Sequence, residues 1–159
     1  MVIDEQLWSV IVSTGPPPPV GPIIHHGIYG QRAGETWHYF YEEELPISFC
    51  IDDIARAYAV IEATEGNGTY SGDAELIDPD GNARGTIYSA FYGYLSSGEQ
   101  AQVLSDPVTL DKLGTWEIHF VIHFEGTVLE EKTWDAITIP VSPPPEEKAF
   151  PWLWLGFGA

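Results

Sequence analysis

The alternation of side chains between residues 116 and 124 constrains the fold more than any other feature of the sequence. Every second position is large and apolar: Trp116, Ile118, Phe120, Ile122 and Phe124. Because successive side chains of a β-strand point to opposite faces of a sheet, this pattern predicts a strand with one buried face. The other face carries Glu117, His119 and His123, so it is either a site or a solvated surface.

Other segments also resemble strands, and the sequence shows no convincing helical periodicity. The strand-like segments are residues 2–12, 36–51, 55–64, 73–95, 100–110 and 136–141. Within residues 73–95, Asp-Pro-Asp-Gly-Asn at 78–82 predicts a tight turn between two strands. Residues 55–64 are apolar on both faces, which suits a central strand, although a short helix also fits. About seven short strands with regular turns indicate an all-β, antiparallel β-sandwich.

Two proline runs divide the chain into three parts. Pro16 to Pro19 follow the first strand-like segment, and Pro143 to Pro145 precede the aromatic C-terminal stretch. Runs of proline favour stiff polyproline II spacers. We therefore expect an N-terminal arm and proline-rich linker at residues 1–32, a β-sandwich at 33–142, and a proline spacer with an aromatic arm at 143–159.

The second half of the chain resembles an immunoglobulin-like domain of the broad bacterial, archaeal and viral kind. The resemblance covers residues 55–141 and rests on the turn at 78–82, the segment "LDKLGTWEIHF" and the final "AITIPV". In that family an Asp-x-x-Gly-x-aromatic segment opens the penultimate strand, and Asp111, Gly114 and Trp116 match it. The resemblance implies an immunoglobulin-like β-sandwich, without the cysteine pair of antibody domains. Its members serve mostly as spacers, adhesion modules, or virion and cell-surface components.

The charge of the chain limits its partners. With 24 acidic and 6 basic residues, the net charge is −18. Such a surface repels phosphate backbones and anionic lipids, so we expect no nucleic-acid partner. Cys50 is the single cysteine, which excludes an internal disulfide and a multi-cysteine zinc site. Because Cys50 lies in an apolar alternating run, we expect a buried, inert thiol. We also expect that the protein binds no cofactor.

Two groups of residues could bind metal ions. Glu117 and His119 lie two apart on a strand and could share one ion, but His123 is a long reach for the same ion. A solvated or interface-facing sheet surface is the preferred interpretation. Asp78, Asp80 and Asn82 resemble the start of a calcium loop but lack its bidentate glutamate, so turn chemistry is preferred there.

The sequence contains no motif for nucleophilic or phosphate chemistry. The glutamate clusters at 42–44 and 130–131 could supply the two carboxylates of a glycosidase, although solvent-facing strand charges explain them as well. His25 and His26 follow the first proline run, and as neighbours on an extended chain they should point in opposite directions. We therefore predict that the protein is not an enzyme.

Aromatic residues form two groups that could stack on sugar rings or on a protein. One is Trp37, Tyr39 and Tyr41, which share one face of the predicted strand 36–51 with Leu45, Ile47, Phe49 and Ile51. The other contains Tyr88, Phe91, Tyr92 and Tyr94. We expect core packing to claim at least half of these rings. A carbohydrate-binding or adhesion module of a cell-surface protein, with a glycan ligand, is therefore the alternative function.

The arms carry apolar residues that are costly to leave in water, since burying a Trp or Leu is worth roughly 1.5–3 kcal/mol. We predict that they contact neighbouring subunits through these residues: Trp8, Val10, Val12, Phe150, Trp152, Trp154 and Phe157. The predicted function is a structural subunit of a virion, extracellular filament or surface layer, assembled as a homo-oligomer or larger complex. The aromatic tail is shorter than the roughly 20 residues of a membrane span, so membrane contact is expected only if the natural chain continues past Ala159.

Overall fold

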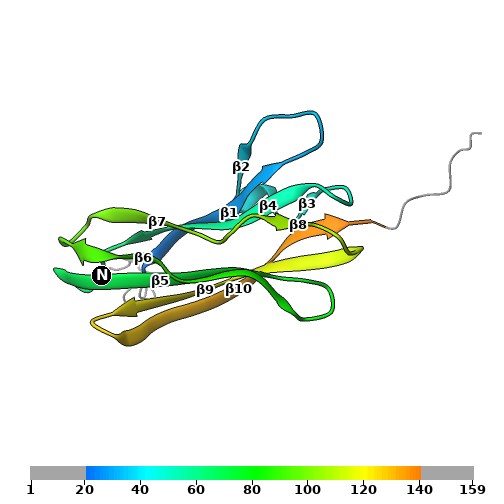
Figure 1. Cartoon of the computed structure of the whole chain (residues 1–159). Coiled ribbons are helices and arrows are strands. Elements are labelled where there is room, and N and C mark those ends of the chain that lie inside the picture. The colour runs from blue at the N-terminus through cyan, green and yellow to red at the C-terminus, as the bar shows by residue number, and fades with distance from the viewer. Residues whose placement is uncertain (1–20, 141–159) are drawn as a thin grey trace, which may run out of the picture.

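The computed structural model describes residues 21–140, and these fold into two β-sheets that form two layers (Figure 1). The first sheet contains, in spatial order, β2 (His38–Tyr41), β1 (Ile23–Gln31), β4 (Ile54–Glu62) and β7 (Gln100–Leu104), and β8 (Val108–Thr109) also pairs with β4. The second contains β3 (Ile47–Ser48), β10 (Thr127–Ile139), β9 (Gly114–Phe124), β5 (Gly68–Ile77) and β6 (Ala83–Leu95). The strands are antiparallel except β3, which is parallel to β10. The prediction of an all-β, two-sheet protein is therefore confirmed, with ten strands in this part of the chain rather than about seven.

The alternating segment that we identified in the sequence forms β9, which lies between β10 and β5 in the second sheet. Trp116, Ile118, Phe120 and Ile122 are all 0% exposed, so one face of β9 is buried as predicted. The neighbouring strand β5 alternates in the same way, with Tyr70 and Leu76 also 0% exposed. These two strands form the inner face of the second sheet.

The facing layer is centred on β4, which pairs with β1, β7 and β8. Its inner side chains are small: Ala55, Ala57 and Ala59 are fully buried, together with Ile61. Small residues here match the large rings of β9 and β5 across the core, because interdigitating layers need complementary volumes. The predicted segment 55–64 therefore forms a central strand, with bounds Ile54–Glu62, and the helical alternative is wrong.

The hairpin predicted around residues 78–82 is present between β5 and β6. The Asp78 N–H donates to the carbonyl oxygen of Asn82 over 2.9 Å, and the Gly81 N–H donates to the carbonyl oxygen of Asp78 over 2.8 Å. Gly81 has φ +88°, a left-handed conformation that favours glycine. The turn chemistry of this segment was thus readable from its residue types.

Two expectations about the chain's first third are wrong. Strand β1 lies within residues 1–32, which we expected to be arm and linker; it pairs with β2 and β4 and buries Ile28 completely. Residues 36–51 do not form one strand, because the 3₁₀ helix η2 (Glu42–Glu44) separates β2 from β3. Three consecutive glutamates cannot be buried without partners, so the chain leaves the sheet at this point.

Cys50 is exposed, contrary to our expectation of a buried thiol. It follows Phe49, which points into the core and is 2% exposed, so the next side chain points away from it. The prediction of a buried thiol failed because only alternate residues of the apolar run around Cys50 face inward. Within residues 21–140, no helix is long and apolar enough to cross a membrane.

We predict that the inner face of β9 carries much of the stability. Phe120→Ala should lower the free energy of unfolding by about 3–5 kcal/mol, because it leaves a cavity between the layers, and Ile118→Val should lower it by about 0.5–1.5 kcal/mol. Denaturant unfolding followed by circular dichroism measures both. Tyr92→Ala is the control, because Tyr92 is 72% exposed and its loss should change stability little. Equal effects of Phe120→Ala and Tyr92→Ala would contradict the buried position of Phe120.

Candidate functional site

The outer face of the first sheet carries a group of aromatic side chains, which we call the aromatic cluster. Its members are Tyr29, Trp37, Tyr39, Tyr41 and Tyr58. Strand pairing brings them together, since Tyr29 lies opposite Tyr39, and Gly27 lies opposite both Tyr41 and Tyr58. The ring centroids of Tyr29 and Tyr39 are 4.3 Å apart, and those of Tyr39 and Tyr58 are 4.8 Å apart. Tyr39 and Tyr41 remain exposed, so this surface offers ring faces to a ligand or partner.

A pocket of about 400 Å³ lies at one end of the aromatic cluster. It is lined by His25, Tyr41, Glu42, Glu43 and Tyr58, and we call it the tyrosine–glutamate pocket. Glu42 Oε2 lies 3.2 Å from His25 Nδ1. Partial burial opposes the charge of Glu42, but hydrogen bonds from backbone N–H groups and from His25 outweigh it and lower the pKa of Glu42. The pocket therefore combines ring faces with a charged carboxylate.

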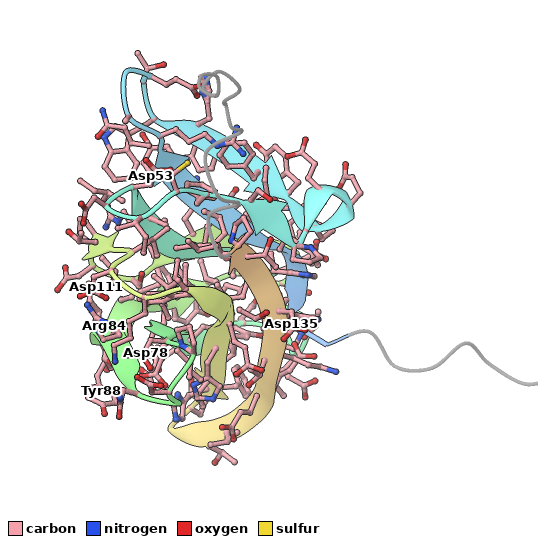
Figure 2. The ribbon with its side chains drawn as sticks, turned by 90° about the vertical axis from the view of Figure 1, so that its right-hand side faces the viewer. Asp53, Asp78, Arg84, Tyr88, Asp111 and Asp135 are labelled. Carbon is pink, nitrogen blue, oxygen red and sulfur yellow. The ribbon has the colours of Figure 1, made fainter. Side chains whose placement is uncertain are left out.

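A second aromatic surface lies on the edge strand β6. Tyr88, Tyr92 and Tyr94 are 79%, 72% and 65% exposed, and Figure 2 shows Tyr88 at the surface. Our expectation that the core claims at least half of the rings in the two groups is wrong, because only Phe91 among these seven rings packs against the core. Phe91 and Leu95 form the inner side of β6, so the tyrosines at even positions point outward.

His119, on the polar face of β9, lies between two carboxylates from the neighbouring strands. Its Nδ1 is 2.7 Å from Glu75 Oε2 on β5, and its Nε2 is 2.7 Å from Glu131 Oε2 on β10. Burial alone would lower the pKa of His119, but the hydrogen bonds with Glu131 and Glu75 outweigh it and raise that pKa. This arrangement joins three strands through one side chain.

The polar face of β9 is thus an outer sheet surface with an ion-pair cluster. A shallow pocket of about 150 Å³ lies beside it, lined by Asp73, Ala74, Glu75, Thr86, Tyr88, His119 and Val121. His119 is engaged by glutamates of other strands rather than by Glu117. In the part of the chain that the structure describes, no three His, Cys, Asp or Glu side chains are arranged to hold a metal ion.

The calcium loop considered at Asp78 and Asp80 has protein cations in place of an ion. Lys112 Nζ lies 3.0 Å from Asp78 Oδ2 and 2.8 Å from Asp80 Oδ2, and Arg84 also pairs with Asp78. Asp78 Oδ1 accepts the backbone N–H groups of Asp80 and Asn82. Burial would raise the pKa of Asp78, but these hydrogen bonds hold it far below its usual range. These contacts support the interpretation as turn chemistry.

Asp111, Gly114 and Trp116, which carry the resemblance, form the corner next to this turn. Asp111 accepts two hydrogen bonds of 3.0 Å from the guanidinium of Arg84, and Figure 2 shows Asp78, Arg84 and Asp111 together on one side of the molecule. The guanidinium carbon of Arg84 lies 5.4 Å from the ring centroid of Trp116. The indole N–H of Trp116 donates to the carbonyl oxygen of Lys112 over 3.0 Å. The role of these residues is therefore structural.

The remaining polar candidates have structural partners. His25 and His26 point in opposite directions, as predicted: His25 faces the pocket, whereas His26 stacks on Trp134 with ring centroids 3.6 Å apart. Burial lowers the pKa of His26. Glu130 accepts the backbone N–H of Ile23 over 3.0 Å, so the glutamates at 130–131 have separate roles.

The predicted interface residues of the arms lie outside the described residues 21–140. They are Trp8, Val10, Val12, Phe150, Trp152, Trp154 and Phe157. The contact between subunits that we expect from them stays a prediction.

Sequence reasoning missed Tyr29 and Tyr58 as members of the aromatic cluster. It also treated the glutamates at 42–44 as ordinary surface charges. A signal for the cluster was present in the sequence, because residues 55–64 are apolar on both faces. The outer face of that strand therefore needed other side chains to cover it. Tyr39 and Tyr41 provide that cover for Tyr58, which is 5% exposed.

No protein-family model matches the chain, and no curated protein matches it. Among solved structures, it is similar to a candidate β-galactosidase from Bacteroides fragilis, with 13% identity, a TM-score of 0.46, and coverage of 69% of this chain and 15% of that one. It is similar to β-glucuronidase 2 of Bacteroides uniformis, with 12% identity, a TM-score of 0.46, and coverage of 69% of this chain and 12% of that one. It is also similar to an alkylpurine DNA glycosylase of Pseudomonas fluorescens, with 10% identity, a TM-score of 0.41, and coverage of 74% of this chain and 30% of that one. The chain thus spans a minor part of each protein, and likenesses at these TM-scores carry no conclusion about its function.

We predict that the contribution of His119 to stability depends on pH. Its pKa in the folded protein is raised above 6.5, the value for an unperturbed histidine, so the folded state binds the proton more tightly. The resulting stabilisation is fully present below pH 6.5 and is lost as pH rises through the folded-state pKa. The difference in unfolding free energy between wild type and His119→Gln should therefore be larger at about pH 5.5 than at about pH 8.5.

Denaturant unfolding at both pH values measures this difference. His38→Gln is the control. It also removes a histidine, but His38 is exposed on β2 and does not lie between carboxylates of two neighbouring strands. A difference for His119→Gln that stays constant or grows with pH would contradict the ion-pair cluster.

Proposed function

We propose that this chain is a non-enzymatic subunit of a protein assembly, built on an immunoglobulin-like β-sandwich. The observation that carries the proposal is the presence of exposed aromatic surfaces on the outer faces of both sheets: the aromatic cluster and the tyrosines of β6. Large aromatic side chains are enriched in protein interfaces and contribute much of their binding energy. Two unlike surfaces on opposite layers suit a subunit that contacts two neighbours.

The immunoglobulin-like assignment is supported by strand order. β1, β4 and β7 follow the order of strands A, B and E, and β10, β9 and β5 follow the order G, F and C, with β6 in the place of C′. The hydrogen bond from the Trp116 indole to Lys112 also resembles the tyrosine corner, in which a ring at the start of strand F bonds to the backbone a few residues upstream.

The arms extend this proposal. Their apolar residues, given above, would fill grooves or add strands on neighbouring subunits, with the proline runs setting their reach. A virion, an extracellular filament or a surface layer fits such a subunit, as a homo-oligomer or a larger complex. The net charge of −18 keeps free subunits apart, so assembly should strengthen when salt screens this repulsion.

The mass of the protein in solution tests the proposal. Analytical ultracentrifugation of the intact chain should detect multimers, and these should grow with salt concentration. Removing residues 1–15 or 146–159 should shift the distribution toward the monomer, because the apolar anchors are lost. Tyr92→Ala with Tyr94→Ala separates the contribution of the β6 surface from that of the arms. A monomeric intact protein, unchanged by either truncation, would refute assembly.

A carbohydrate-binding or adhesion module is the second candidate, and the exposed tyrosines of β6 favour it. Tyr92 and Tyr94 are two residues apart on one strand, so their rings lie about 7 Å apart and could stack on successive sugars. A glycan array probed with the intact protein tests this function. Binding should disappear in Tyr92→Ala and persist in Tyr39→Ala, and an array without any bound glycan would remove this candidate.

A further inference from the structure

The tyrosine–glutamate pocket has a composition that neither proposed function requires. We propose that it binds an organic ammonium group, such as a quaternary amine or the ammonium of a lysine side chain. The inference does not rest on assembly, because the pocket lies within one chain and is formed by β1, β2, η2 and β4.

Two tyrosine rings form the walls of the pocket. The ring centroids of Tyr41 and Tyr58 are 6.2 Å apart, and the ring planes meet at 69°. A cation within about 6 Å of a ring centroid is attracted by the negative face of the ring. Tyr58 is 5% exposed and packs edge to face with Tyr41, so Tyr41 offers the accessible ring face and Tyr58 supports it. Tyr41 is 40% exposed, so its ring remains accessible from solvent.

Strand register brings the two rings together beside the pocket. Gly27 pairs with Tyr41 on one side and with Tyr58 on the other, and it contributes no side chain to that row. A Cβ atom at Gly27 would collide with the carbonyl oxygen of Phe40, so the close pairing of β1 with β2 requires glycine at this position. The same glycine thus holds the strands close together and places the two rings in one row.

The charge of the pocket selects the sign of the ligand. Glu42 and Glu43 line it, and His25 is the only basic residue among its five lining residues. Carboxylates next to aromatic rings complement an ammonium group, whereas they repel phosphate, sulfate or carboxylate ligands. The net charge of −18 adds to this preference, but the rings distinguish the pocket from the rest of the acidic surface.

Titration of the intact chain with choline chloride tests the proposal. The total chloride concentration is kept constant, and the tyrosine ring resonances are followed by NMR. The neutral isostere 3,3-dimethylbutan-1-ol has the same shape without the charge. Choline should shift the Tyr41 and Tyr58 resonances saturably, and the isostere should not. Nα-acetyl-lysine amide in a parallel titration distinguishes the sources: tighter binding than choline indicates a protein side chain, and weaker binding indicates a free quaternary amine.

Variants separate the rings from the general charge. Tyr41→Leu should weaken choline binding by at least about fivefold, whereas Tyr41→Phe should retain it, because only the π-face is needed. Glu43→Gln should weaken binding, whereas Glu65→Gln, an exposed carboxylate outside the pocket, makes the same change in net charge and should not. Equal binding of the isostere, equal effects of the two glutamate variants, or the absence of saturable shifts in the intact chain would each overturn the proposal.

Discussion

The structure depends on the burial of one face of β9 between the two layers. Trp116, Ile118, Phe120 and Ile122 are removed from water completely, and β9 is paired on both sides, with β5 and β10. A slip of one residue in either pairing would exchange these buried apolar side chains for Glu117 and His119, which have no partners in the core. The register of the second sheet is therefore set by hydrophobic burial, and the polar contacts of its outer face follow from that register.

The ion pairs at the end of the sandwich add a second constraint. Arg84 on β6 contacts both the turn residue Asp78 and Asp111, which precedes β9, while its guanidinium lies over Trp116. Asp78 is buried, so its charge is tolerated only because hydrogen bonds and two cations surround it. These contacts attach the hairpin turn to the start of β9. The oxygen atoms that suggested a calcium loop are thereby used within the protein itself.

The parts of the fold that were predictable from the sequence are those with local signals. The turn at 78–82, the buried face of β9 and the central position of β4 each depend on residues close together in the chain. The short strands β2, β3 and β8 lie within the predicted segments 36–51 and 100–110, but where each begins and ends depends on partner strands, and no local pattern marks those bounds. The 36–51 segment illustrates this, because its apolar alternation is broken only at Glu43 and resumes at Leu45, whereas the strand itself ends at Tyr41.

The candidate site was harder to predict for the same reason. The sequence analysis placed Tyr88, Tyr92 and Tyr94 in one group with Phe91, whereas Phe91 packs against the core and the three tyrosines are exposed. The contact of His119 with Glu75 and Glu131 depends on the register of three strands, which the sequence of one strand does not contain. Similarly, Tyr41 and Tyr58 become neighbours only because both pair with Gly27. Sites built across strands require the pairing to be known first.

The register shifts of β6 affect how its edge could pair with a strand of another molecule. β6 is an outer strand of 13 residues, and within the described part of the chain it is paired with β5 alone. Its ladder is interrupted between Gly72 and Ala74 of β5, where Ser89 adopts φ +55°. The register shifts again between Ala74 and Leu76, and the carbonyl oxygen of Gly85 accepts the N–H of Asp106, so the outer edge of β6 is interrupted at more than one place. Bulges are one of the devices by which natural edge strands avoid sheet-to-sheet aggregation, and here the bulge lies on the strand that carries Tyr88, Tyr92 and Tyr94.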